Sequence, residues 1–166
     1  MQIREIQEKD NKRMEQIIKR SLESFDLNIP GTAYYDPQLG NLAQFYKEQQ
    51  PHARYWVIVN EQDEAVGGVG IAPFGLERDV CELQKLYIAP VAQGQGLSRK
   101  LMNTALNFAE EHYTYCYLET MKKLQVANLL YVKYGFRQLD KPLDGSEHNT
   151  MDAWYLKELR GISSLE

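Results

Sequence analysis

A short stretch in the middle of the chain has the residue types of an anion-binding loop. It reads Gln93-Gly94-Gln95-Gly96-Leu97-Ser98. Apolar residues then recur at spacings of three and four, at Leu97, Leu101, Ala105 and Phe108, and this spacing predicts a helix that begins at the loop. Such a junction presents unpaired backbone N–H groups and the positive end of the helix dipole. A phosphate group suits it best, because glycine lets the ligand approach the backbone closely.

The spacing of the loop excludes two common phosphate-binding motifs. The nucleotide P-loop requires Gly, four residues, Gly, then Lys and Ser or Thr, and the chain lacks that order here. The dinucleotide motif requires a third glycine at position 99, where Arg99 stands. The stretch instead resembles the acyl-CoA loop of the GNAT superfamily of N-acetyltransferases, which reads Arg or Gln, two residues, Gly, one residue, then Gly or Ala. Ser98 departs from the last position, but it is small and adds a hydroxyl donor.

A second motif follows in the order that this family requires. Leu118-Glu119-Thr120 precedes a run from Ala127 to Phe136 that reads Ala-Asn-Leu-Leu-Tyr-Val-Lys-Tyr-Gly-Phe. It resembles the family's strand followed by Ala-x-x-Leu-Tyr-x-x-x-Gly-Phe. By itself the run predicts a helix that carries Leu130 and Tyr131 on one side and ends at Gly135, a left-handed residue. The resemblance covers about residues 53–159.

Composition limits the remaining possibilities. With 166 residues and 43% hydrophobic content, the chain is expected to form one domain over residues 1–160, followed by a tail at 161–166. The net charge of −4 and the lack of a basic stripe disfavour nucleic-acid binding. No apolar run has membrane-spanning length, and no signal peptide is recognised. Two cysteines and three scattered histidines give no disulfide framework and no metal-ligand spacing, so we expect a cytoplasmic protein without a metal.

Hydrophobic periodicity predicts an α/β protein with a mixed sheet, in the order β-α-α-β-β-β-α-β-α-β-β. Strands are expected near residues 3–6, 54–59, 65–72, 80–88, 115–120, 136–139 and 151–159. Helices are expected after Asp10, from Asp36-Pro37, after Gly96 and over residues 126–134. In the fourth strand Leu83 and Leu86 are three apart, which indicates a β-bulge near Gln84-Lys85. The resemblance implies seven strands, about four helices and splayed central strands.

The resemblance also implies transfer of an acetyl group from acetyl-CoA to an amine. The family's cofactor contacts fall on Leu86, Tyr87, Ile88, Asn128, Tyr131 and the loop from Gln93 to Ser98. A backbone N–H of Tyr87 or Ile88 would stabilise the oxyanion, because a bulge frees such groups from the sheet. Tyr131 would be the general acid, since a phenol stays protonated at neutral pH. A purely packing role for Tyr131 is the alternative.

The general base is less defined by the sequence. Glu82, before the bulge, is the first candidate, and Glu119 at the end of the facing strand is the second. A solvated position, or a salt bridge to Lys85 or Lys122, would explain either glutamate equally well.

The resemblance places acceptor recognition over residues 25–46 and in the loop 140–149, and the candidate substrate-binding residues are Tyr34, Tyr35 and Glu119. Tyr34, Tyr35 and Asp36 could form an aromatic and anionic site for an ammonium group. Half-buried tyrosines beside a helix cap at Asp36 are the alternative. The expected activity is N-acetylation of a small-molecule amine in a ternary complex. An acyl-CoA sensor without turnover and a protein acetyltransferase are the two alternatives, and a homodimer is left open.

Overall fold

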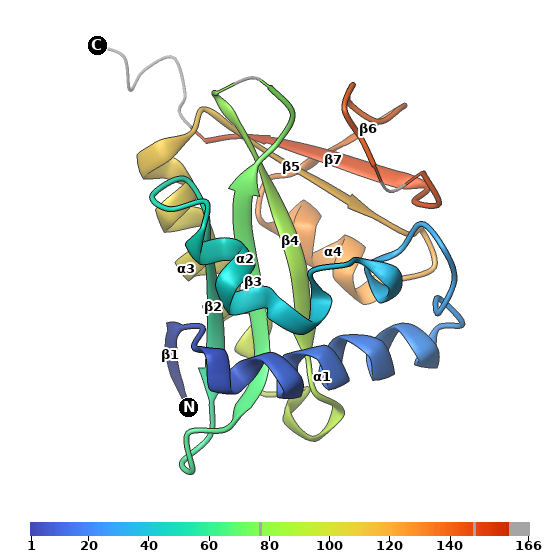
Figure 1. Ribbon diagram of the computed structural model, residues 1–166. Coiled ribbons are helices and arrows are strands. Elements are labelled where there is room, and N and C mark those ends of the chain that lie inside the picture. The colour runs from blue at the N-terminus through green and yellow to red at the C-terminus, as the bar shows by residue number, and fades with distance from the viewer. Residues whose placement is uncertain (77, 148, 160–166) are drawn as a thin grey trace.

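A twisted seven-stranded sheet with helices on both faces organises the protein, as Figure 1 shows for a computed structural model. The structure describes residues 1–76, 78–147 and 149–159, so the expected tail at 161–166 lies outside the described residues. The strand order is β1-β2-β3-β4-β5-β7-β6. Neighbouring strands are antiparallel except for β4 and β5, which are parallel. The expected mixed sheet is therefore confirmed.

The elements lie close to their expected positions. The strands are β1 (Gln2–Glu5), β2 (Arg54–Val59), β3 (Ala65–Pro73), β4 (Val80–Ile88), β5 (Tyr115–Thr120), β6 (Arg137–Leu139) and β7 (Ala153–Glu158). The helices are α1 (Asn11–Ser24), α2 (Leu42–Lys47), α3 (Leu97–His112) and α4 (Gln125–Lys133). Among the described residues, no helix combines the length and apolar character needed to cross a membrane.

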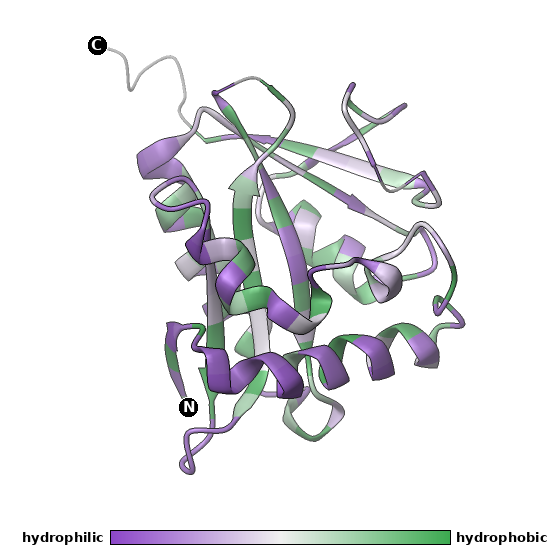
Figure 2. Ribbon diagram, in the orientation of Figure 1, coloured by the Kyte–Doolittle hydropathy of each residue, from purple (hydrophilic) through white to green (hydrophobic). Residues whose placement is uncertain are grey.

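Strand alternation divides the interior into two cores, one on each face of the sheet. On β2, Trp56 and Ile58 pack with α3, whereas Tyr55 and Val57 pack on the face covered by α1 and α2. The expected apolar stripe of α3, from Leu97 to Phe108, is buried in the first core. In Figure 2 the visible, outward side of α1 is mainly hydrophilic, as expected for a helix with one buried face.

The central strands part because their pairing is short. β4 and β5 are in register only at three positions, Val80 with Tyr115, Cys81 with Cys116 and Glu82 with Tyr117. Beyond Glu82 the two strands diverge, and Figure 1 shows β5 turning away from β4. The splayed strands that the family resemblance implied are confirmed.

A β-bulge lies in β4, where the slip in its apolar pattern predicted one. Gly70 faces Gln84 and Gly68 faces Tyr87, so two residues of β4 lie opposite one residue of β3. Lys85 has a φ of 51°, in the left-handed region that the first residue of a G1-type bulge adopts. As a consequence Leu83 and Leu86 both contact the α3-side core although they are three residues apart.

One predicted helix start is wrong. Asp36-Pro37 does not begin a helix: the chain forms two 3₁₀ turns, Ala33–Tyr35 and Leu39–Asn41, and α2 begins at Leu42. The carboxylate of Asp36 lies 2.9 Å from Nζ of Lys85, in an ion pair with the bulge residue. This contact between distant segments explains the error, because it uses the carboxylate that the sequence pattern assigned to a helix cap.

Candidate functional site

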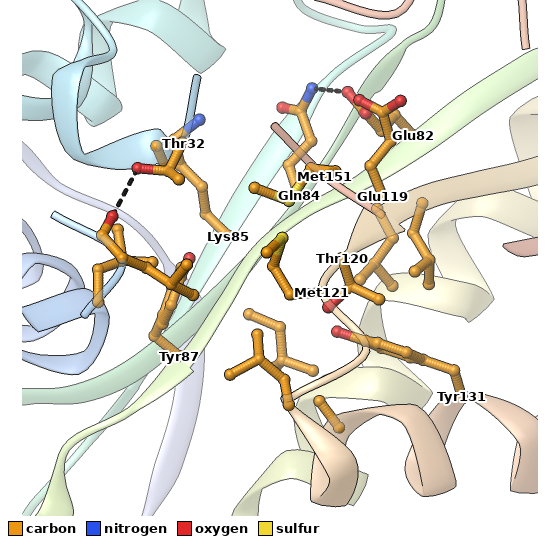
Figure 3. Close-up of a pocket in the computed structure, with 18 residues that line it drawn as sticks. Thr32, Glu82, Gln84, Lys85, Tyr87, Glu119, Thr120, Met121, Tyr131 and Met151 are labelled. Carbon is orange, nitrogen blue, oxygen red and sulfur yellow. Dashed lines mark hydrogen bonds between the residues drawn. The ribbon is translucent and has the colours of Figure 1, made fainter. Parts of the chain in front are cut away.

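A cleft opens where β4 and β5 part, and Figure 3 shows the residues around it. The strands contribute residues 82–87 and 118–121. The start of α4 and its first turns contribute Leu124, Ala127 and Tyr131, and the remaining wall consists of Leu22, Leu27, Thr32, Ala33 and Met151. We call this the strand cleft. It combines an apolar lining with a few polar groups, which is the usual composition of a small-molecule site.

The strand cleft has two chemically different sides. Leu83 and Leu118 point into the α3-side core, so the alternating residues Glu82 and Glu119 point toward the opposite face of the sheet. Tyr131 enters from α4, on the α3 side. Carboxylates therefore approach the cleft from one face of the sheet and a phenol from the other.

Glu82 is oriented by a chain of hydrogen bonds. Nε2 of Gln84 donates to Oε1 of Glu82 at 2.6 Å, and Oε1 of Gln84 accepts from the hydroxyl of Tyr46 at 2.6 Å. Burial raises the pKa of Tyr46 well above its usual range, so this phenol remains a donor. Because the Tyr46 hydroxyl donates to the amide oxygen of Gln84, the amide nitrogen of Gln84 faces Glu82. The Gln84 amide group thus orients the carboxylate of Glu82 in the cleft.

Glu119 is held by two hydroxyl groups. Oε2 of Glu119 accepts from the hydroxyl of Tyr117 at 2.8 Å and also from the hydroxyl of Ser146. Tyr117 in turn accepts the backbone N–H of Leu143 at 3.2 Å. This network ties the loop after β6 to β5 beside the cleft.

Tyr131 points its hydroxyl into the strand cleft, as Figure 3 shows. Its ring packs between Phe136 and Tyr155, and the residue is only 7% exposed. Burial raises the pKa of Tyr131, so the phenol is protonated throughout the neutral range. Within the described part of the chain the hydroxyl has no hydrogen-bond partner. The hydroxyl is not among the buried polar atoms that lack a partner, so it is open to the cleft and available to a ligand.

Two tyrosines reach the bulge by crossing the glycine-rich strand β3. A Cβ atom at Gly68 would lie 2.5 Å from the ring of Tyr55, and one at Gly70 would lie 2.6 Å from the hydroxyl of Tyr46. The hydroxyl of Tyr55 donates to the backbone oxygen of Lys85 at 2.8 Å. These glycines are therefore required for close approach, and the tyrosines anchor the bulge.

Lys85 is the bulge residue and has a buried partner. Its side chain is 5% exposed and that of Asp36 is 12% exposed, and their charged groups are 2.9 Å apart. The sequence reasoning placed Lys85 at the expected bulge and offered it as a salt-bridge partner for a glutamate. The structure shows instead that its charge is matched by Asp36 from the segment between α1 and α2.

The glycine loop has the geometry of an anion site. Gly94 and Gly96 have φ values of 80° and 74°, and a Cβ atom at either would meet nothing within 4 Å, so the space in front of the loop is open. Nε2 of Gln93 holds the loop by donating to the oxygen of Ile88 at 3.1 Å. The first backbone N–H groups of α3, at Leu97 and Ser98, have no hydrogen-bond acceptor within the helix. These observations fit a pyrophosphate.

Helix α4 lies beside the first turn of α3. The hydroxyl of Tyr134 donates to the backbone oxygen of Arg99 at 3.1 Å, which links α4 to the first turn of α3. Asn128 uses both amide protons within the chain, on the oxygens of Met121 and Leu124, and its Oδ1 accepts from Tyr155. A cofactor contact by Asn128 would have to use the second lone pair of Oδ1. The expected contact stays a prediction.

Five of the expected residues line the strand cleft, whereas Ile88, Asn128, the loop from Gln93 to Ser98 and two tyrosines do not. Leu86 and Tyr87 line the strand cleft beside Glu82, and Ile88 follows them at the buried end of β4. Tyr34 and Tyr35 do not line it: the hydroxyl of Tyr34 donates to Glu23 at 2.7 Å, and Tyr35 is 60% exposed.

Sequence reasoning missed Gln84 and Tyr46. A signal was present for them, because a glycine-rich strand beside the bulge indicates that large side chains cross it.

Comparisons with known proteins agree with this geometry. The model of the acetyltransferase (GNAT) family matches residues 14–136. An uncharacterized N-acetyltransferase of Escherichia coli (strain K12), YjgM, is 39% identical over 153 residues, covering 90% of each protein.

Two solved structures share the fold at low sequence identity. A GNAT-family acetyltransferase from Staphylococcus aureus Mu50 has a TM-score of 0.80 and 20% identity, covering 96% of this chain and 99% of that one. A phosphinothricin acetyltransferase from Sinorhizobium meliloti, solved with acetyl-CoA, has a TM-score of 0.72 and 15% identity, covering 98% of this chain and 90% of that one. Given the family match and the E. coli relative, the chain belongs to the GNAT family of acetyltransferases.

Proposed function

We propose that this protein transfers an acetyl group from acetyl-CoA to a primary amine of a small molecule, by direct attack in a ternary complex. One observation carries the proposal: the hydroxyl of Tyr131 and the oriented carboxylate of Glu82 approach the same strand cleft from opposite faces of the sheet. Membership of the acetyltransferase family supports acetyl-CoA as the donor.

The residues that would hold acetyl-CoA are those of the glycine loop and the first turn of α3. Backbone N–H groups from Gly94 to Ser98 would bind the pyrophosphate, and the open space at Gly94 and Gly96 permits its approach. Acetyl-CoA supplies the acetyl group as an activated thioester. The backbone N–H of Tyr87 or Ile88, beside the bulge, would donate a hydrogen bond to the carbonyl oxygen.

Two side chains would move protons. Glu82 would accept a proton from the attacking amine, directly or through a water molecule, and Gln84 would orient the carboxylate toward it. Tyr131 would give its proton to the departing sulfur as the new nitrogen–carbon bond replaces the carbon–sulfur bond. The raised pKa of Tyr131 keeps that proton in place until the thiolate forms.

One edge of the strand cleft is closed by a contact between two loops, which favours a small acceptor over a peptide. The hydroxyl of Thr150 donates to the oxygen of Pro30 at 2.8 Å, and Gly31 packs directly against Thr150. The segment after α1 and the loop before β7 therefore meet at this edge of the site. An extended peptide requires an open groove, which this contact obstructs.

A panel assay tests the proposal. Amines, amino acids and aminoglycosides are incubated with acetyl-CoA, free thiol is measured, and the acetylated product is identified by mass spectrometry. We expect thiol release that depends on a small primary amine. The product should be about 42 Da heavier than the amine, because an acetyl group replaces one hydrogen. Tight acetyl-CoA binding without release for any acceptor would favour the sensor, and mass shifts confined to peptides would favour the protein acetyltransferase.

A cytoplasmic location belongs to the same proposal. Cys81 and Cys116 are register partners on β4 and β5 and are both free thiols, which suits a reducing compartment. The homodimer stays a prediction.

A further inference from the structure

Thr120, the last residue of β5, is polar and buried. Asp10, Asn11 and Thr32 are also polar and buried, and each of them is held by hydrogen bonds to other residues. The hydroxyl of Thr120 has no such partner among the described residues. It is not among the buried polar atoms that lack a partner, so the 5% of Thr120 that stays exposed includes this hydroxyl. Because Thr120 lines the strand cleft, the hydroxyl opens into it.

Thr120 and Tyr131 lie on the same face of the sheet. Thr120 pairs with Ala153 and Leu118 pairs with Tyr155 between β5 and β7, and residues directly opposite one another share a face. Ala153, Leu118 and Tyr155 all belong to the α3-side core, so the side chain of Thr120 points to that side as well. The ring of Tyr131 contacts that of Tyr155, with 5.9 Å between their centroids. Figure 3 shows the hydroxyls of Thr120 and Tyr131 directed into the same part of the cleft.

The acid step of the proposed reaction is unfavourable for a phenol that acts alone. In water a phenol has a pKa of about 10 and a thiol a pKa of about 8.5, so a phenol is the weaker acid of the two. Burial raises the pKa of Tyr131 and widens this difference. A hydrogen bond donated to the phenolate oxygen favours the charged form and narrows it. The proton transfer therefore requires a donor on the same side of the cleft as Tyr131.

Thr120 is the side-chain donor that meets this requirement among the described residues that line the cleft. The other side-chain donors of the lining either have a partner within the chain or pack on the opposite, α1-side face: Thr32, Gln84, Lys85 and Tyr87. Thr120 and Tyr131 are not hydrogen-bonded to one another in the structure. Catalytic hydrogen bonds are often long until the reacting complex forms, so the geometry suits a contact that tightens during the reaction.

We propose that Thr120 is a positioning residue for the acid step, whose hydroxyl donates a hydrogen bond to the oxygen of Tyr131, directly or through one water molecule. This inference rests on the proposed function. The carbon–sulfur bond breaks, its electron pair stays on sulfur, and the sulfur takes the proton of Tyr131. The phenolate that remains accepts the hydrogen bond from Thr120. It regains a proton through solvent from Glu82, which received one from the attacking amine.

The substitution Thr120→Val tests the proposal, because it replaces the hydroxyl by a methyl group of similar size. We measure the rate of thiol release in a single turnover, with enzyme in excess over acetyl-CoA and with the best amine of the panel. The rate should fall about ten- to a hundredfold. Thr120→Ser keeps the hydroxyl and should stay within about fivefold of the native rate. Calorimetry should find near-native acetyl-CoA affinity for both variants.

The melting temperature separates this role from a structural one. The hydroxyl of Thr120 has no partner among the described residues, so Thr120→Val should melt no lower than the native chain although it is slower. A hydroxyl that held the fold would instead lower the melting temperature when it is removed. Thr114→Val is the matched control, because Thr114 is half-buried just before the other end of β5. It should leave the rate of thiol release unchanged.

A double-mutant cycle tests whether Thr120 acts through Tyr131. In the Tyr131→Phe background no phenolate forms, so adding Thr120→Val should change the rate by less than about twofold. A fall in that background as large as in the native chain would overturn the inference.

The remaining outcomes are also decisive. A Thr120→Val rate within about twofold of the native rate would overturn the inference and leave the proposed function standing. Release of no thiol by the native chain with any primary amine would refute the proposed function, and the inference with it. If Thr120→Val fails to fold, as judged by thermal melting, Thr120→Ser and Thr120→Ala decide, because they differ by one oxygen atom. A serine variant less than about twofold faster than the alanine variant would overturn the inference.

Discussion

Gln84 offers the sharpest test of how the strand cleft is built. The substitution Gln84→Met keeps the length of the side chain and removes both of its hydrogen bonds. Glu82 then loses the amide donor at 2.6 Å, and the hydroxyl of Tyr46 loses its acceptor at 2.6 Å. Tyr46 is only 1% exposed, so water cannot readily replace that acceptor.

The two losses have different magnitudes and different readouts. A hydrogen bond to a charged group contributes about 1.5–3 kcal/mol, which corresponds to a fall in kcat/KM of about 10- to 150-fold if Glu82 must be oriented to act. A buried hydroxyl without a partner costs about 1–3 kcal/mol of stability. For a chain of this size, each 1 kcal/mol lowers the melting temperature by about 2–4 °C.

A matched control separates catalysis from stability. Gln44 on α2 also has a half-buried side chain, and its Oε1 accepts from Asn11 at 2.8 Å outside the cleft. We expect Gln44→Met to lower the melting temperature without affecting kcat/KM, and both variants to bind acetyl-CoA normally by calorimetry. The reasoning is refuted if Gln84→Met is destabilised but keeps kcat/KM within about twofold of the native value.

Three further predictions follow from the structure. Tyr131→Phe should lower kcat by about ten- to a thousandfold while calorimetry finds near-native acetyl-CoA affinity, and an unchanged kcat would remove Tyr131 from the acid role. Gly96→Val should abolish acetyl-CoA binding, whereas Gly75→Val, at another open position with φ of 64°, should lower stability alone; normal affinity of the first variant in calorimetry would contradict the loop assignment. Burial raises the pKa of Tyr55 and of Tyr117 above the unfolded value of about 10, so the unfolded chain loses these protons first and stability should fall above about pH 10, by up to about 1.4 kcal/mol per pH unit for each tyrosine. Melting curves at pH 9 and about pH 11 test this, and equal melting temperatures would contradict it.

Much of the fold could be predicted because its signals are local. Strands β2 and β4 were expected with the bounds that the structure has, since alternation and turn residues mark their ends. The bulge was also readable, because the spacing of Leu83 and Leu86 records the slip in phase within one strand. The family motifs placed the glycine loop and Tyr131 for the same reason: each motif is contiguous in the chain.

The rest depends on contacts between distant segments. Tyr46 and Gln84 are 38 positions apart, and nothing in either local pattern indicates that one orients the other. Asp36 illustrates the same limit, because Asp followed by Pro is a helix-start pattern whether or not the carboxylate binds elsewhere. Here it pairs with Lys85, and the helix begins at Leu42. The strand alternation could have indicated that Glu82 and Gln84 share a face, but the hydrogen bond between them required the structure.

The crossing of β3 by two tyrosines has a kinetic consequence. Tyr46 and Tyr55 fix the bulge through hydrogen bonds to Gln84 and Lys85. The separation between β4 and β5 is therefore maintained by the folded core itself. A ligand can then enter without a separation of the strands. The free-energy cost of ordering the residues of the cleft arises during folding and does not arise again on binding. Encounter with acetyl-CoA should therefore appear as a single exponential phase whose rate rises linearly with concentration, without a slow isomerisation that saturates.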